Sequence, residues 1–183
     1  MAPEFPSDRS LKQSPSVQPL DRTRIHHAKH ILYFRNTSPP MQRKVKLLTI
    51  GKVKYSWIED GIREYTKRIP GLTITELKDS QKRTEWTEIT PHIKTQDYVV
   101  VLTERGKLYN SLDFASFIEK TTLDHTLLFV IGSSDGITPE LERSAHHQLA
   151  LSPMTFTHDM ARLLLVEQIY RATSILSNGS YHK

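Results

Sequence analysis

Residues 126–136 read TLLFVIGSSDG, an apolar run that stops abruptly at a glycine. Five consecutive apolar residues before Gly132 are typical of a strand buried on both faces of a sheet, and the Gly/Ser segment after it is typical of a tight loop. Strands buried on both faces occur in parallel sheets that carry helices on each side. This stretch therefore predicts an α/β fold.

The segments on either side agree with that prediction, because strand and helix patterns alternate along the chain. The run YVVVLTERG has the β-branched character of another central strand, and SLDFASFIEKTTL has helical spacing with Ser111 as a candidate N-cap. We predict strands over 45–51, 72–78, 98–106 and 126–131, a short strand and loop over 149–156, helices over 56–71, 111–123, 138–150 and 158–176, and a loop with a short helix over 79–96. The expected architecture is a mostly parallel sheet flanked by helices.

The first forty residues differ in composition from the rest. They are rich in Pro, Ser and basic residues and lack a long apolar periodicity, so we predict a disordered extension over 1–40 and one domain over 41–183. The extension holds six Lys or Arg and three Asp or Glu, which leaves the domain a net charge of +2 out of +5. A native extension, an organellar transit peptide and an upstream start before Met41 all fit, although the acidic residues argue against a transit peptide.

Composition excludes several classes of protein. The chain has no cysteine, which rules out disulfides, thiolate metal sites and a cysteine nucleophile. No apolar run approaches the roughly 18–20 residues of a membrane span, and no signal-peptide core is visible. His146 and His147 have no third ligand at metal-binding spacing, so we expect no metal and interpret them as helix-surface residues. We expect a cytoplasmic protein, or an organellar one if 1–40 is a transit peptide.

Three predicted strand ends carry residues suited to a ligand. In open α/β sheets, ligands bind beyond the carboxyl ends of the strands, which here are 102–106, 131–136 and 151–158. Gly132 and Gly136 would let a ligand approach the backbone closely, although a tight strand-to-helix turn explains them equally well. The loop is not a P-loop, because no Gly-Lys-Ser/Thr follows, and it lacks the three glycines of a dinucleotide fingerprint.

The last predicted helix, HDMARLLLVEQIYRATSIL, opens with residues of interest. His158 lies at the positive helix end, where it belongs to a site or, with Asp159, caps the helix. Arg162, one turn later, opposes the helix dipole, which favours an anion-binding role. Glu167 and Arg171 are spaced i, i+4, and we interpret them as a surface ion pair.

The same helix is apolar over most of its circumference. Residues 163–166 read LLLV, which is more than a helix buried on one side needs. The surplus predicts a second buried surface, most simply in a homodimer. Beyond the helix and a turn come Tyr181, His182 and Lys183, three groups suited to an anionic, aromatic substrate, whereas most domains end in a few frayed polar residues.

The C-terminal sequence LSPMTFTHDMARLLLVEQIYRATSILSNGSYHK resembles the C-terminus of the RlmH (YbeA-type) family of SPOUT-class ribosomal RNA methyltransferases. KLLTIGKVK, LTERGK, SLDFA and FVIGSSDG resemble upstream segments of that family, so the resemblance covers 45–183 but not the first forty residues. The C-terminal motif matches at Leu151, Ser152, Thr155, His158, Arg162, Leu165, Glu167, Gln168, Tyr170, Arg171, Ala172, Ile175, Tyr181 and His182.

The resemblance implies a SPOUT α/β knot, in which the C-terminal segment of a mostly parallel sheet threads a loop as a trefoil knot. It implies a homodimer that holds S-adenosylmethionine in the knot and methylates N3 of a pseudouridine in large-subunit rRNA on the assembled ribosome. The cofactor residues carried over are Leu102, Gly132, Leu151, Ser152, Pro153, Met154, Thr155 and Phe156.

The resemblance and the residue chemistry together suggest catalytic roles. His158 and His182, the latter from the partner subunit, are candidates for the base or orienting group. Arg162 would hold a phosphate or stabilise a developing anion, Tyr181 would stack on the base, and Lys183 would add a cation toward the RNA.

Three departures from the family pattern leave alternatives open. Ser133 stands where a second glycine is usual, Thr103 stands where an acidic residue is more common, and 79–96 is shorter than usual. The alternatives are a SPOUT methyltransferase for another RNA such as tRNA, and a non-catalytic RNA-binding or ribosome-assembly module on the same fold. A nucleotide-binding enzyme of small molecules is a more distant one.

Overall fold

The computed structural model describes residues 44–78, 85–133 and 136–182, with the side chains of 85 and 86 excepted. The predicted boundary between 1–40 and 41–183 lies outside these residues and stays a prediction.

A five-stranded sheet with the order β2-β1-β4-β3-β5 forms the centre of the described region. Every pair of neighbouring strands is parallel. The strands are β1 (Val45–Ile50), β2 (Leu72–Leu77), β3 (Asp97–Leu108), β4 (Thr126–Ile131) and β5 (His147–Ala150). The predicted parallel α/β sheet is confirmed, whereas the trefoil knot stays a prediction from the resemblance.

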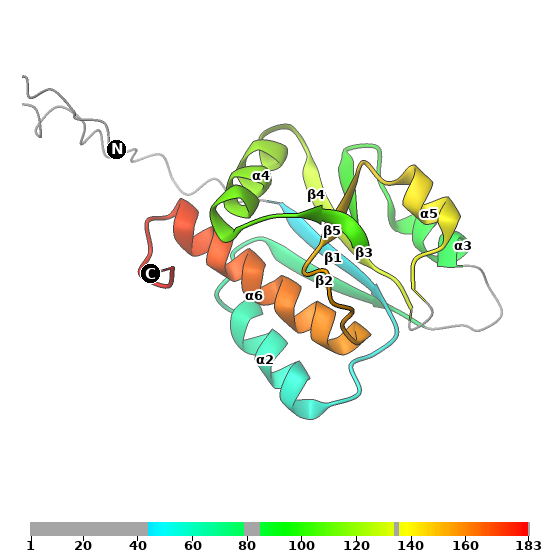
Figure 1. Cartoon of the computed structure of the whole chain (residues 1–183), viewed down its shortest axis with the longest axis horizontal. Coiled ribbons are helices and arrows are strands. Elements are labelled where there is room, and N and C mark those ends of the chain that lie inside the picture. Colours follow the sequence, from blue (N-terminus) through cyan, green and yellow to red (C-terminus); the bar gives the residue numbers. More distant parts are fainter. Residues whose placement is uncertain (1–43, 79–84, 134–135, 183) are drawn as a thin grey trace, which may run out of the picture. The chain divides into compact units, whose positions relative to one another are not determined.

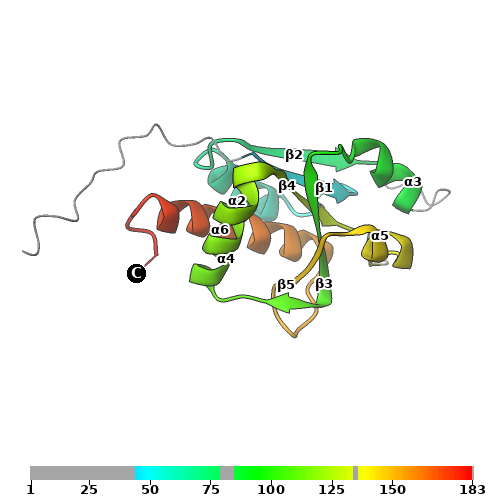
Figure 2. The ribbon, with the colours of Figure 1, turned by 90° about the horizontal axis from the view of Figure 1, so that it is seen from above.

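Helices cover both faces of this sheet, as Figures 1 and 2 show. On one face α6 lies between α2 and α4 and contacts both, and on the other face α3 contacts α5. The helices are α2 (Ser56–Thr66), α3 (Glu85–Ile89), α4 (Ser111–Asp124), α5 (Pro139–Ser144) and α6 (His158–Leu176), with a 3-10 turn at Thr90–His92. The short helix predicted within 79–96 is α3, and residues 79–84 lie outside the described part.

The central strand β4 divides the core into two layers. Leu127, Phe129 and Ile131 pack among the residues of α2, α4 and α6, whereas Leu128 and Val130 pack with residues of α3 and α5. Successive strand side chains point to opposite faces, so a strand that lies between two helical layers must be apolar throughout. This explains why residues 127–131 form an unbroken apolar run.

Helix α6 has the predicted bounds, but its N-cap is neither His158 nor Asp159. The hydroxyl of Thr157 accepts from the backbone N–H of Met160, at 3.4 Å, and caps the first turn. The capping alternative for His158 is therefore wrong. At the other end of the helix, Arg171 is paired with Glu167 as expected.

Two sequence-based assignments are corrected. Helix α5 ends at Ser144 rather than at 150, because Ala145 is extended and the following residues pair with β3 as β5. His146 and His147 therefore lie at the start of an edge strand and not on a helix surface: His146 Nδ1 accepts from the backbone N–H of Val99 at 3.0 Å. In α4 the N-cap is Asn110 rather than Ser111, because the Asn110 side chain accepts from the Asp113 N–H at 2.8 Å.

Strand β3 passes β5 in an irregular way that shapes the site. Both Leu102 and Lys107 pair with Leu149, so residues 103–106 form an excursion between the two pairings. Gly106 closes the excursion against the backbone of β5: a Cβ there would lie 2.4 Å from the carbonyl carbon of Leu149. The excursion directs residues 103–105 toward the carboxyl edge of the sheet.

Candidate functional site

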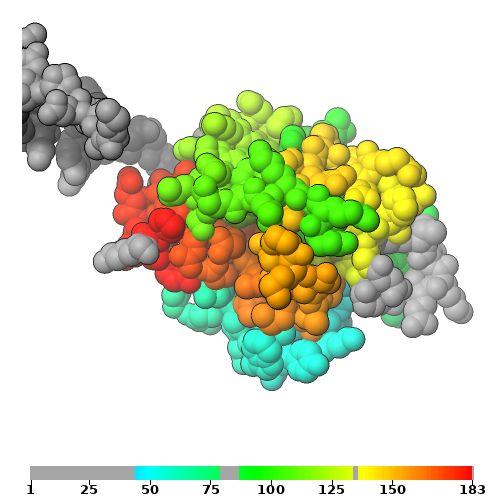
Figure 3. Space-filling view, in the orientation of Figure 1, coloured from blue at the N-terminus to red at the C-terminus, as the bar shows by residue number. Residues whose placement is uncertain are grey.

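A pocket of about 990 Å³ lies at the carboxyl ends of the strands. Its size is at the upper end of the ~300–1,000 Å³ that is usual for small-molecule sites. Four chain segments line it: 50–55 after β1, 102–105 in β3, 131–137 after β4 (without 134 and 135), and 149–161 after β5 (without Ala150, Pro153 and Met160). Figure 3 shows the segment after β5, in orange, on the surface between β3 in green and α2 in cyan.

Most of the predicted cofactor residues line this pocket. They are Leu102, Gly132, Leu151, Ser152, Met154, Thr155 and Phe156. Pro153 is exposed and does not contribute to the lining. The hydroxyl of Ser152 accepts from the backbone N–H of Met154 at 3.0 Å, which stabilises the turn that carries these residues.

The segment after β1 was not predicted to contribute. Gly51 adopts a φ of +85°, a left-handed conformation that glycine accommodates best, and the chain then turns so that residues 51–55 form one wall of the pocket. The only signal in the sequence was a glycine directly after an apolar strand. The general rule that ligands bind at strand ends would have included this fourth end.

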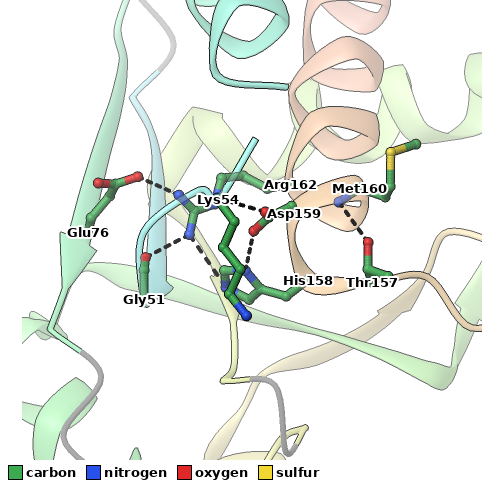
Figure 4. A network of polar contacts seen from close by, with 8 residues as sticks. All are labelled: Gly51, Lys54, Glu76, Thr157, His158, Asp159, Met160 and Arg162. Atoms are coloured by element: carbon green, nitrogen blue, oxygen red, sulfur yellow. Dashed lines mark hydrogen bonds and ion pairs between the residues drawn. The ribbon is translucent and has the colours of Figure 1, made fainter. Parts of the chain in front are cut away.

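His158 and Asp159 begin α6 and line the pocket, and Figure 4 shows their contacts. His158 Nδ1 lies 3.2 Å from Asp159 Oδ1, and Asp159 Oδ2 accepts from the backbone N–H of Lys54 at 2.9 Å. Asp159 is only 6% exposed. These bonds join the start of α6 to the loop after β1, so two walls of the pocket are held together.

Arg162 lies behind His158 rather than in the pocket lining. It is 1% exposed, forms an ion pair with Glu76 of β2, and donates to the carbonyl oxygen of Gly51 at 2.9 Å. Its Nη2 also lies 3.4 Å from His158 Nε2. Burial lowers the pKa of Arg162 and the Glu76 carboxylate acts against this, so the guanidinium stays charged. A buried arginine that is already paired within the protein is better suited to support the pocket wall than to contact RNA directly.

Asp159 links the stability of this site to pH. Burial raises the pKa of Asp159, but hydrogen bonds from Lys54 and His158 and the charge of Arg162 outweigh burial, and the pKa lies below its usual value. A carboxyl group with a lower pKa in the folded state adds stability above its unfolded pKa and loses it as the pH falls through the folded pKa.

We therefore expect the thermal unfolding midpoint of the wild type to fall more steeply below about pH 4 than that of Asp159→Asn, which lacks the titrating group. Midpoints measured from pH 7 downward provide the comparison. If the unfolding midpoints of the two proteins fell equally with pH, the expected role of Asp159 would be contradicted.

Tyr181 packs against the far end of α6 and does not line the pocket. Its ring lies 4.6 Å from that of Tyr170, and the Arg171 guanidinium lies 4.8 Å from the ring centre. Its hydroxyl lies 3.3 Å from that of Tyr65 and donates to Glu167 at 3.1 Å. The hydrogen bond with Tyr65 raises the pKa of Tyr181, with burial and Glu167 adding to it, so the phenol is neutral at physiological pH.

Fewer contacts are known for His182 and Lys183 than for Tyr181. His182 Nδ1 is buried and has no hydrogen-bond partner among the described residues. Lys183 lies outside them. The structure thus separates the predicted catalytic residues: His158 borders the pocket, Arg162 supports it from behind, and Tyr181 and His182 lie elsewhere in the same chain.

Aromatic and cationic side chains gather near the pocket mouth. Tyr55 and Phe156 line the pocket and are 59% and 36% exposed, and Trp57, 59% exposed, has its ring 6.4 Å from that of Tyr55. Lys52 and Lys54 also line the pocket and have exposed side chains. Exposed rings beside ammonium groups suit unpaired nucleotides, which stack on aromatic faces and carry phosphates.

Among the described residues, none of the helices combines the length and the apolar character that a membrane span requires. Among the same residues, no group of three or more His, Cys, Asp or Glu side chains is arranged to hold a metal ion.

Comparison with solved structures agrees with the parallel α/β fold. A solved structure described as a probable methylase family protein from Haemophilus influenzae Rd KW20 aligns with a TM-score of 0.50 and 14% identity, over 76% of this chain and 69% of that one. The two chains thus share an α/β fold.

Sequence comparison identifies the family. Residues 43–182 match the model of a family described as predicted SPOUT methyltransferases, and the chain belongs to this family. It is 47% identical over 140 residues to the Ribosomal RNA large subunit methyltransferase H of Prochlorococcus marinus (strain MIT 9211), a match that covers 76% of this chain and 96% of that relative. The protein of the same name from Synechococcus sp. (strain CC9311) is 44% identical over the same shares.

Proposed function

We propose that this protein is an S-adenosylmethionine-dependent methyltransferase that modifies N3 of a pseudouridine in large-subunit rRNA on the assembled ribosome, in the cytoplasm. The observation that carries the proposal is the pocket at the carboxyl edge of the sheet, in a chain whose relatives named Ribosomal RNA large subunit methyltransferase H align over 96% of their length.

The residues present fit the cofactor. Apolar side chains of Leu102, Ile131, Leu149 and Leu151 provide a surface for a flat adenine ring, and the turn after β5 presents backbone groups beside it. Ser133 lines the pocket at a position where the family more often has a glycine. The pocket keeps a volume of about 990 Å³ with this serine present. When bound, S-adenosylmethionine would supply a methyl group activated by a sulfonium.

The remaining chemistry falls to the side chains of the protein. N3 of the substrate base is a poor nucleophile while it carries its proton, so the site must favour loss of that proton and hold the base in line. His158, which lines the pocket, would orient groups within it. Tyr55, Trp57, Lys52 and Lys54 would hold nucleotides of the RNA.

The C-terminal residues would complete the site in a homodimer. Tyr181 and His182 do not line the pocket of their own chain, so we propose that they act at the pocket of the partner subunit. In that place Tyr181 would stack on the base, His182 would act as base or orienting group, and Lys183 would add a cation.

The main alternative is a non-catalytic RNA-binding module on the same fold, and cofactor binding separates it from an enzyme. We expect the purified full chain to bind S-adenosylmethionine with one site per chain in calorimetry and to lose that heat when S-adenosylhomocysteine is present. A folded protein that binds neither compound would contradict the proposal. Transfer to tRNA rather than ribosomes would instead favour another RNA target.

A further inference from the structure

Both ring nitrogens of His158 face side chains of opposite hydrogen-bonding type. Nδ1 lies 3.2 Å from a carboxylate oxygen of Asp159, and Nε2 lies 3.4 Å from Nη2 of Arg162. An ionised carboxylate can only accept hydrogen bonds, and a guanidinium can only donate them. A neutral imidazole satisfies both neighbours only when its hydrogen is on Nδ1 and its lone pair is on Nε2.

Neither neighbour is free to turn away. Asp159 is 6% exposed and also accepts from the backbone N–H of Lys54, at 2.9 Å. Arg162 is 1% exposed and is held by the Glu76 carboxylate and by the Gly51 carbonyl oxygen, as Figure 4 shows. Moving either side chain would leave a buried charge without its partners, which is strongly unfavourable.

We propose that Asp159 and Arg162 lock His158 in the Nδ1–H tautomer, which makes His158 a positioning residue of the pocket wall and not the general base of the reaction. The lone pair that a base would use is already accepting a hydrogen bond from Arg162. Glu76 acts through Arg162 and is a positioning residue as well. The catalytic part of this assignment rests on the proposed function, whereas the tautomer does not.

The tautomer can be read directly. In protein with ¹⁵N-labelled histidine, at a pH at which the imidazole is neutral, two-bond ¹⁵N–¹H correlations distinguish the two tautomers, and His158→Gln assigns the signals. The proposal expects the Nδ1–H pattern for His158. An Nε2–H pattern, or fast exchange between the two, would overturn it.

Kinetics provide the second test. Glutamine keeps one acceptor and one donor but cannot take up a proton, so His158→Gln should retain kcat for ribosome methylation within about tenfold of the wild type. Loss of a general base would lower kcat by about 10²–10⁴-fold. His158→Ala should lose more than His158→Gln, because it leaves both Asp159 and Arg162 without this partner.

A matched control is Glu140→Gln, which removes one side of the exposed ion pair with Arg143 and should leave kcat unchanged. Equal losses of about 100-fold or more in His158→Gln and His158→Ala, with both proteins folded, would overturn the proposal. Failure of the wild type to methylate ribosomes would contradict the proposed function instead, and the tautomer measurement would still decide the structural claim.

Discussion

A chain that ends at Ser180 is expected to bind S-adenosylmethionine with nearly unchanged affinity and to transfer no measurable methyl group to ribosomes. Tyr181 and His182 do not line the pocket of their own chain, so we expect their removal to leave the cofactor walls intact. Removal takes away the phenol, imidazole and ammonium groups that we propose to act at the partner subunit's pocket. Turnover should fall to background while the cofactor Kd changes little.

The truncation is expected to lower the stability of the protein without unfolding it. Tyr181 gives up ring contacts with Tyr65 and Tyr170 and the contact with Arg171, and such pairs are worth about 0.5–1.5 kcal/mol each. Tyr181→Phe is the matched control, because it keeps the ring and loses the hydroxyl bonds to Glu167 and Tyr65. Wild-type turnover in the truncated chain would contradict the proposed role of residues 181–183 in the active site.

The second large effect is expected at Gly106, where Gly106→Ala should disrupt the pocket. The added Cβ would lie 2.4 Å from the Leu149 carbonyl carbon and 2.6 Å from its nitrogen, both backbone atoms of β5 that cannot move alone. Overpacking usually lowers the free energy of unfolding by about 1–3 kcal/mol. Because the clash at Gly106 is with backbone atoms, we expect a loss at the upper end of this range or beyond it. We expect either loss of folding or separation of β5 from β3.

Because β5 leads directly into the turn of residues 151–157, a displaced β5 would carry the cofactor wall with it. Gly106→Ala that still folds should therefore bind S-adenosylmethionine much more weakly than the wild type. Gly61→Ala is a useful control: its nearest contact, at 3.0 Å, is the end of the Leu163 side chain, which can adjust. Calorimetry and thermal unfolding of both variants give the comparison, and wild-type stability and affinity in Gly106→Ala would contradict the account.

The parts of the fold that local patterns determine could be predicted from the sequence. The unbroken apolar run before Gly132 marks a strand between two helical layers, and the periodicity of α6 predicts both of its ends. The start of strand β5 at His147 could not be predicted in this way, because the pattern indicated a helix up to 150 and a strand only from 149. Its residues continue the pattern of α5, and only their pairing with β3, more than forty residues earlier, makes them a strand.

The site shows the same division between local and distant causes. Strand-end loops could be predicted to line a pocket because parallel strands end at one edge. The burial of Arg162 could not, because its partner Glu76 lies 86 residues away in the sequence. A dipole argument predicted an anion near Arg162, and that anion is the Glu76 carboxylate within the protein.

The most direct test of the proposed function uses ribosomes from a strain that lacks the modification. The purified full chain is added with methyl-labelled S-adenosylmethionine, and the label is then located by nuclease mapping and mass spectrometry. The account predicts label on N3 of one pseudouridine in the large-subunit rRNA, and none with the chain that ends at Ser180. Measurable cofactor binding with no label on the ribosome would contradict it.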